Sequence, residues 1–229
     1  MTKRKRSNRQ QQALAAQKAR ERKQRLQIGA IVTVVLAVLS VLLWAANRPR
    51  LVDGSQPAAP EGLAWGPVNA PVVIENWSDF NCSYCGLLAT GVAKQIEEMY
   101  GETGRVRFEF KNFAFLQPNS LTAAEAAFCA AEQELFWPYH DMLFANQGRF
   151  ADSELKQYSR ELGLDQAAFD ECLDSGAYSS EIERLREEGT ARGVNSTPTL
   201  FVNDTKITGA VSLETFQQAI EDELAKAGQ

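Results

Sequence analysis

An uncharged apolar stretch near the N-terminus constrains this chain more than any other feature. Residues 28–46 read IGAIVTVVLAVLSVLLWAA, nineteen positions without a charged side chain. As an α-helix rising about 1.5 Å per residue, this stretch is about 28 Å long, close to the thickness of the hydrocarbon core of a bilayer. We therefore expect residues 28–46 to form a single transmembrane anchor in contact with lipid.

Basic residues lie mainly on the N-terminal side of this stretch. The first 27 residues hold ten Lys or Arg and one acidic residue, Glu21, whereas only Arg48 and Arg50 follow closely. Positive charge stays on the cytoplasmic side, so residues 1–27 are expected to be a basic cytoplasmic tail of a single-pass cell-membrane protein with its main domain outside. A cleaved signal peptide fits less well, because the apolar run is long and Leu43-Trp44-Ala45 is a poor cleavage sequence.

Composition changes again after the anchor. Residues 47–70 are rich in Pro, Gly and Ala and lack periodicity, which is typical of a linker. Residues 71–229 are long enough for one domain with a real core. The whole chain has a net charge of −5, but residues 51–229 carry 12 basic and 28 acidic side chains, so we expect no nucleic-acid partner.

Hydrophobic periodicity predicts the order of elements in this domain. Strands are predicted over 72–77 and 105–110, with a helix over 85–100 between them, so the two strands should be parallel. Helices are then predicted over 121–133, 136–146, 153–162, 166–173 and 179–191, followed by a hairpin of strands 199–202 and 206–208 and a last helix capped by Ser212. This order matches an α/β thioredoxin fold with a helical insertion at about 120–175.

Two cysteines separated by two residues stand where the first strand gives way to the first helix, in FNCSYCG at 80–86. Unpaired N–H groups and the helix dipole stabilise an anion there, so we predict a lowered pKa and a nucleophilic role for Cys82. Cys85 should remain a thiol until it attacks a mixed disulfide at Cys82. A closed structural disulfide and half of a zinc site are alternatives; neither the lone His140 nor the separated Cys129 and Cys172 supplies a second closely spaced ligand pair.

Three motifs together resemble the membrane-anchored DsbA-like thiol-disulfide oxidoreductases. They are GPVNAPVVIENWSDFNCSYCG at 66–86, FWPYHDMLFANQ at 136–147 and GVNSTPTLFVN at 193–203. The resemblance implies a DsbA-like thioredoxin domain over 71–229. It also implies a cis bond between Thr197 and Pro198 that faces the cysteines and presents the Thr197 backbone to an incoming peptide. An ordinary trans proline at the start of a strand is the alternative.

The resemblance also implies roles for residues other than Cys82, Cys85, Thr197 and Pro198. Acids at the place corresponding to Glu75 lie under the active-site helix of related proteins and accept the proton of the buried cysteine, whereas the alternative is a solvent-facing glutamate. Family members with a second bridge imply a structural Cys129–Cys172 disulfide, worth about 4 kcal/mol for a loop of that length; a redox relay or two unpaired thiols are alternatives. His140, beside aromatic residues on a predicted helix, is typical of packing.

The resemblance implies an enzyme that passes the Cys82–Cys85 disulfide to reduced exported proteins, with no cofactor and no metal. Reoxidation would come from a quinone-linked membrane partner, as the family implies, or from small oxidants. Ser83-Tyr84 replaces the Pro-His of the best-known member, so the disulfide should be less oxidising. An isomerase or reductase is the close alternative. A membrane-tethered metal-delivery protein is a different one, although copper carriers of this fold typically have a CxxxC and a distal His.

Overall fold

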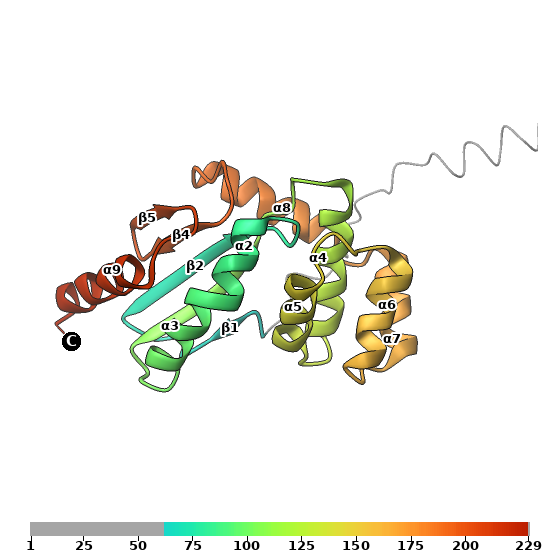
Figure 1. Cartoon of the computed structure of the whole chain (residues 1–229), viewed down its shortest axis with the longest axis horizontal. Coiled ribbons are helices and arrows are strands. Elements are labelled where there is room, and N and C mark those ends of the chain that lie inside the picture. Colours follow the sequence, from blue (N-terminus) through green and yellow to red (C-terminus); the bar gives the residue numbers. More distant parts are fainter. Residues whose placement is uncertain (1–61, 229) are drawn as a thin grey trace, which may run out of the picture. The chain divides into compact units, whose positions relative to one another are not determined.

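The computed structural model describes residues 62–228, so the tail predicted over 1–27, the anchor over 28–46 and most of the linker lie outside the described residues. Within the described part, no helix is long and apolar enough to cross a bilayer. The elements follow one another as drawn in Figure 1: β1 (Ala64–Trp65), β2 (Val72–Ser78), α2 (Ser83–Leu87), the π-helical turn η1 (Leu88–Val92), α3 (Ala93–Tyr100), β3 (Val106–Asn112), α4 (Pro118–Ala131), α5 (Phe136–Ala145), α6 (Asp152–Glu161), α7 (Gln166–Ser175), α8 (Ser179–Ala191), β4 (Thr199–Val202), β5 (Thr205–Thr208) and α9 (Leu213–Lys226).

These strands form one sheet in the order β1-β3-β2-β4-β5. β2 and β3 are parallel, with Asn76 opposite Phe110, which confirms the predicted βαβ unit. β4 is antiparallel to β2, and β5 returns beside β4 as the predicted hairpin. The turn of that hairpin places Asn203 at a φ of 51°, in the left-handed region that asparagine adopts more readily than most residues.

The first strand of the sheet was not predicted. Ala64–Trp65 pairs antiparallel with β3, and the Trp65 ring stacks on Phe108 with 5.3 Å between ring centroids. The linker predicted over residues 47–70 is therefore wrong in its last part, because residues 64–65 already belong to the sheet. Two residues are too few to show the alternation by which strands are found in a sequence.

The two faces of the sheet are covered by different helices. Ile74 of β2 packs with Leu88 of η1, Ile96 of α3 and Phe216 of α9 on one face. Trp77, the next-but-two residue of the same strand, packs on the other face with Val194, which follows α8. Side chains alternate along a strand, so neighbouring residues of β2 point to opposite faces of the sheet and pack against different helices.

The helical insertion, α4 to α7, occupies residues 118–175 between β3 and α8, which confirms the position predicted at about 120–175. Figure 1 shows α5, α6 and α7 gathered around α4 at the end of the sheet where β2 and β3 finish. Buried alanines and Phe128 make α4 the centre of this cluster. A disulfide between Cys129 of α4 and Cys172 of α7 links the first and last helices of the insertion.

Candidate active site

Cys82 and Cys85 lie at the start of the continuous helical segment α2–η1–α3, directly after β2. Cys82 is the N-cap residue of α2, and its Sγ accepts a hydrogen bond from the backbone N–H of Cys85 at 3.4 Å. This is the position at which a side-chain acceptor satisfies one of the free N–H groups of a helix start. Both cysteines are free thiols, Cys82 being 6% exposed and Cys85 1%.

The two sulfurs differ strongly in acidity. Hydrogen bonding from the Cys85 thiol, together with Thr197 and the backbone N–H groups of Cys85 and Tyr84, lowers the pKa of Cys82 to about 6 despite its partial desolvation. Burial is the main reason that the pKa of Cys85 is raised well above that of a free thiol. At neutral pH, Cys82 is therefore a thiolate and Cys85 a thiol, an asymmetry that agrees with the predicted roles of nucleophile and resolving cysteine.

The bond between Thr197 and Pro198 is cis, as the resemblance implies. It precedes β4, which lies antiparallel to β2, so the end of one strand is brought beside the start of the active-site helix. The carbonyl oxygen of Thr197 lies 3.2 Å from Sγ of Cys82, which donates a hydrogen bond to it when Cys82 is protonated. The predicted site residues Cys82, Cys85, Thr197 and Pro198 are thus brought together by segments more than a hundred residues apart.

Asp79 organises the turn before the cysteines, and the sequence analysis missed it. The side chain is fully buried. One carboxylate oxygen accepts from Asn81 N and Ser120 Oγ at 2.8 and 2.9 Å, and the other from Phe115 N and Leu116 N at 2.9 and 3.0 Å. Asp79 thereby fixes this turn to the loop after β3 and to α4. The sequence feature that could have indicated this role is the position of Asp79, an acidic residue between the predicted strand and the CxxC.

Gln147, at the end of the motif 136–147, holds the same turn from the other side. Its Nε2 donates to the carbonyl oxygens of Phe80 and Cys82, both at 2.8 Å. The amide lies so close to α2 that a Cβ on Gly86 would come within 2.8 Å of its Oε1. Gly86 therefore allows the Gln147 amide to lie this close to α2. Gln147 belongs to the motif at 136–147, but the motif does not indicate that its amide binds the turn before the cysteines.

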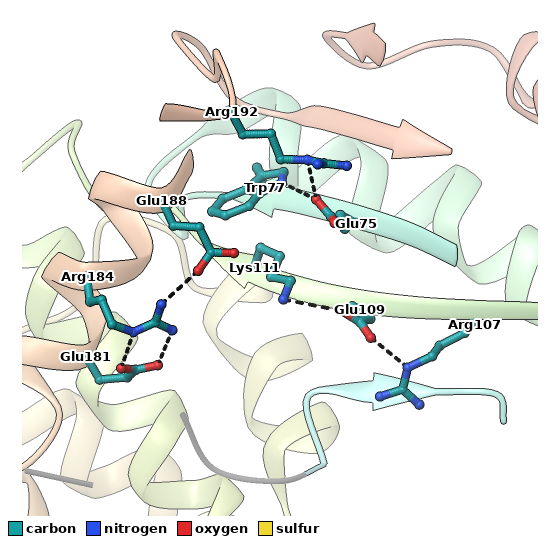
Figure 2. A network of polar contacts seen from close by, with 9 residues as sticks. All are labelled: Glu75, Trp77, Arg107, Glu109, Lys111, Glu181, Arg184, Glu188 and Arg192. Carbon is teal, nitrogen blue, oxygen red and sulfur yellow. Dashed lines mark hydrogen bonds and ion pairs between the residues drawn. The ribbon is translucent and has the colours of Figure 1, made fainter. Parts of the chain in front are cut away.

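Glu75 does not lie under the active-site helix, so the role predicted for it is wrong. Its Oε2 accepts a hydrogen bond from Nε1 of Trp77 at 3.0 Å and forms an ion pair with Nε of Arg192 at 2.8 Å, as Figure 2 shows. Trp77 and Arg192 belong to the α8 side of the sheet. The alternation of β2 instead directs Asn76, which is 2% exposed, toward η1 and α3.

The remaining predicted residues lie in the helical insertion. Cys129 and Cys172 form the disulfide that the resemblance implies, with Cα atoms 5.8 Å apart. His140 of α5 is buried, and its Nδ1 lies 2.9 Å from Oδ1 of Asp141. Among residues 62–228 there is no group of three or more His, Cys, Asp or Glu side chains arranged to hold a metal ion.

A thiolate at a helix start, a buried partner thiol and a cis-proline loop on this sheet define a thiol-disulfide oxidoreductase with the thioredoxin fold. The chain belongs to the thioredoxin family, whose model, described as Thioredoxin, matches residues 58–222. The fold is similar to that of oxidised BdbD from Bacillus subtilis, with a TM-score of 0.67 and 23% identity over 73% of this chain and 97% of that one. It is also similar to DsbA from Chlamydia trachomatis, with a TM-score of 0.64 and 17% identity over 76% and 96% of the two chains.

Curated relatives are longer proteins. The Na(+)/H(+) antiporter NhaA 3 of Salinispora tropica is 31% identical over 212 residues, which are 87% of this chain and 32% of the antiporter. The Na(+)/H(+) antiporter NhaA of Herminiimonas arsenicoxydans is 32% identical over 206 residues, again 32% of its length. The chain thus spans about a third of the length of these relatives.

Proposed function

We propose that this protein introduces disulfide bonds into exported proteins, from a catalytic domain held outside the cell membrane by residues 28–46. The observation that carries the proposal is the Cys82 sulfur, a thiolate at neutral pH, placed against Thr197 of the cis-proline loop with Cys85 hidden behind it. A stabilised thiolate is a good leaving group, which favours passing a disulfide on to another protein.

The exchange follows from this geometry. The thiolate of a reduced substrate attacks Sγ of Cys82, the Cys82–Cys85 bond breaks, and Cys85 leaves with the electron pair and takes up a proton. A second substrate thiolate then attacks the mixed disulfide and expels Cys82 as a thiolate, which leaves a disulfide in the substrate. Two electrons pass to the enzyme, and a quinone-linked membrane partner would remove them.

The surface around Cys82 supports an unfolded polypeptide as substrate. Seven large apolar side chains are exposed among the described residues, and five of them lie on α2, on the loop fixed by Asp79 or at the start of α4: Tyr84, Leu87, Phe115, Leu116 and Leu121. Exposed apolar surface of this kind marks interaction sites, and unfolded chains offer the apolar side chains to occupy it.

The extracytoplasmic location rests on residues 1–46. The apolar run and the basic residues before it favour an anchored protein with its N-terminus in the cytoplasm. Ion transport is not part of the proposal, since the chain spans only a third of its antiporter relatives. Labelling of single cysteines introduced at residues 10 and 60 of the Cys82→Ser/Cys85→Ser variant with a membrane-impermeant reagent tests the topology: residue 60 should react in intact cells and residue 10 only after lysis.

The activity is tested with the oxidised full chain and a reduced peptide that contains two cysteines. We expect the peptide to be oxidised by the native protein and not by Cys82→Ser. Cys85→Ser, first converted to the nitrothiobenzoate disulfide of Cys82, should exchange with a peptide that has one cysteine, release the coloured thiolate and remain as a mixed disulfide with that peptide. The double variant Cys129→Ala/Cys172→Ala is the matched control, because it removes two cysteines and should retain the activity. Oxidation by Cys82→Ser at the native rate would refute the proposal.

The direction of the reaction needs a separate measurement. Equilibration of the Cys82–Cys85 pair with glutathione buffers gives its reduction potential. A potential above about −180 mV, between those of protein disulfide isomerase and DsbA, supports the oxidase. A value near about −270 mV, that of thioredoxin, supports the alternative of a reductase.

A further inference from the structure

Proton transfer at Cys85 is a requirement that the site described so far does not meet. If the proposed function holds, Cys85 gains a proton each time the disulfide opens and loses it each time the disulfide forms. Its side chain is 1% exposed, so that proton must pass through the protein interior. Glu75 lies on the wrong face of the sheet, and both oxygens of Asp79 are already engaged by four donors.

The side of the sheet beneath Cys85 is unusually polar. Ser78 acts to lower the pKa of Cys85, and its buried Oγ has no hydrogen-bond partner. Two residues earlier on the same face of β2, Asn76 is buried, and its Oδ1 has no hydrogen-bond partner. A buried acceptor without a partner destabilises the fold, which indicates that a water molecule satisfies it.

A small cavity of about 10 Å³ is lined by Asn76. Asn76 lines it from the sheet, Ala89 from the helical turn that follows Cys85, and His140 from α5. Lys94 and Glu97 of α3 line the side toward the surface. The volume is near the lower limit for one water molecule, and the lining supplies the polar partners that such a water requires.

His140 is the group in this cavity that is suited to exchange a proton. Its ring is enclosed by five aromatic side chains: Phe80, Phe110, Phe136, Trp137 and Phe144. The charged groups that act on the ring are Asp141, Lys94 and Glu97, and burial outweighs them and lowers its pKa, so the imidazole is neutral. Because Nδ1 lies 2.9 Å from the carboxylate of Asp141, Nδ1 carries the hydrogen and Nε2 is the basic nitrogen.

Asp141 completes a path to solvent. Its side chain is 44% exposed, and its second oxygen forms an ion pair with Lys94 at 2.9 Å. A histidine whose Nδ1–H is held by a carboxylate is a stronger base at Nε2 and is fixed in orientation. The cavity, His140 and Asp141 thus connect the buried Asn76 with the surface.

We propose that His140 exchanges the proton of Cys85 through one water held by Asn76 in this cavity. When Cys85 attacks a mixed disulfide, its proton passes by Ser78 and the water to Nε2 of His140. The Cys85–Cys82 bond forms, and the bond from Cys82 to the substrate breaks with the electron pair leaving on the substrate thiolate. Opening of the disulfide reverses the route and returns the proton to Cys85.

A single reaction reports both cysteines separately. The reduced full chain is mixed with one equivalent of 5,5′-dithiobis(2-nitrobenzoate). Attack by Cys82 releases one coloured thiolate, and attack by Cys85 on the resulting mixed disulfide releases a second. The first phase measures the nucleophile, and the second measures the step that needs the proton acceptor, so both rates are followed from pH 5 to 9.

Two variants and one control give the decisive comparison. In His140→Gln the second phase should slow about 100-fold at pH 7 and lose the pH dependence that the imidazole gives it, while the first phase stays within about twofold. Asp141→Asn should move that dependence to lower pH, because the carboxylate favours the protonated imidazole. Asp174→Asn, another exposed aspartate paired with a lysine, should change neither phase.

A second substitution in the same cavity tests whether the rate of the second phase can be restored. Asn76→Asp in the His140→Gln background should recover most of the second phase, since a carboxylate then lines the same cavity. An unchanged second phase and pH profile in folded His140→Gln would overturn the proposal, as would equal slowing of both phases. If His140→Gln does not fold, an unchanged profile in Asp141→Asn overturns it. Absence of the first phase in the native protein would instead refute the proposed function.

Discussion

The two cysteine pairs of this protein show that burial does not decide what a cysteine does. All four side chains are buried, with exposed fractions between 1% and 7%. Cys82 stands at a helix start, where N–H groups have no partner within the helix and stabilise a thiolate. Cys129 lies inside α4, where the backbone N–H groups are already bonded to the preceding turn. The position along a helix therefore separates the reactive Cys82 from the structural Cys129.

The spacing of each pair agrees with this division. Cys129 and Cys172 are 43 residues apart, and a bridge across so long a loop removes much conformational entropy from the unfolded chain. Cys82 and Cys85 are three apart, and their bridge constrains the unfolded chain much less. One disulfide can thus stabilise the insertion while the other opens and closes at little cost to the fold.

Removal of the structural bridge should give the largest effect on stability. Cys129→Ala/Cys172→Ala is expected to lower the free energy of unfolding by about 4 kcal/mol, from the entropy of closing the loop. Urea denaturation of the oxidised protein and the variant measures the difference. The pH midpoint of Cys82 alkylation should remain near 6 in the variant; a shift of that midpoint, or a loss of stability below about 1 kcal/mol, would contradict the division between the pairs.

Loss of the Asp79 charge should be the next largest change. Asp79→Asn leaves one acceptor oxygen and places an NH₂ group against donors that the carboxylate now accepts, so a loss of about 2–3 kcal/mol in unfolding free energy is expected. Asp174→Asn on the surface is the control and should lose less than about 1 kcal/mol. Equal stability of the two variants would show that Asp79 does not fix the active-site turn.

Most of the fold follows from periodicity in the sequence. The predicted helix over 179–191 and the strand over 199–202 coincide with α8 and β4: apolar residues recur at helical spacing in α8, and β4 is a short apolar run before a turn. β1 shows no such repeat in two residues. The π-helical turn η1 was also missed, since it continues a helix without a change in residue type.

The candidate site was predictable only where its chemistry depends on residue type. The CxxC and the Thr-Pro before a strand mark Cys82, Cys85 and Pro198 directly. Glu75 was assigned one position away from Asn76, and along a strand that single position selects the opposite face. Asp79 and Gln147 act through contacts with segments 36 to 67 residues distant, which no local pattern reveals.

Titration of the Cys82 thiol distinguishes the reactive cysteine pair from the structural one without removing either pair. Alkylation of Cys82 in the reduced protein should rise with a midpoint near pH 6, and Cys85→Ala should raise that midpoint, because the Cys85 thiol is the main contributor to the lowered pKa. An unfolded thiol titrates near 9.0, so the unfolded state binds more protons between pH 6 and 9. The reduced protein should therefore lose stability as the pH falls from 9 toward 6, and an absence of this slope would contradict the stabilised thiolate.

The smallest effect on stability is expected for a substitution of Glu75. This substitution also tests whether the two faces of β2 have different roles. Glu75→Gln breaks an ion pair with Arg192 that is partly exposed, so the loss of unfolding free energy should stay below about 1 kcal/mol. Both phases of the dithiobis(nitrobenzoate) reaction should keep their rates and pH profiles, because the carboxylate faces α8 and not Cys85. A slowed second phase in Glu75→Gln would show that protons reach Cys85 across the sheet, and would remove the reason for assigning the route to Asn76 and His140.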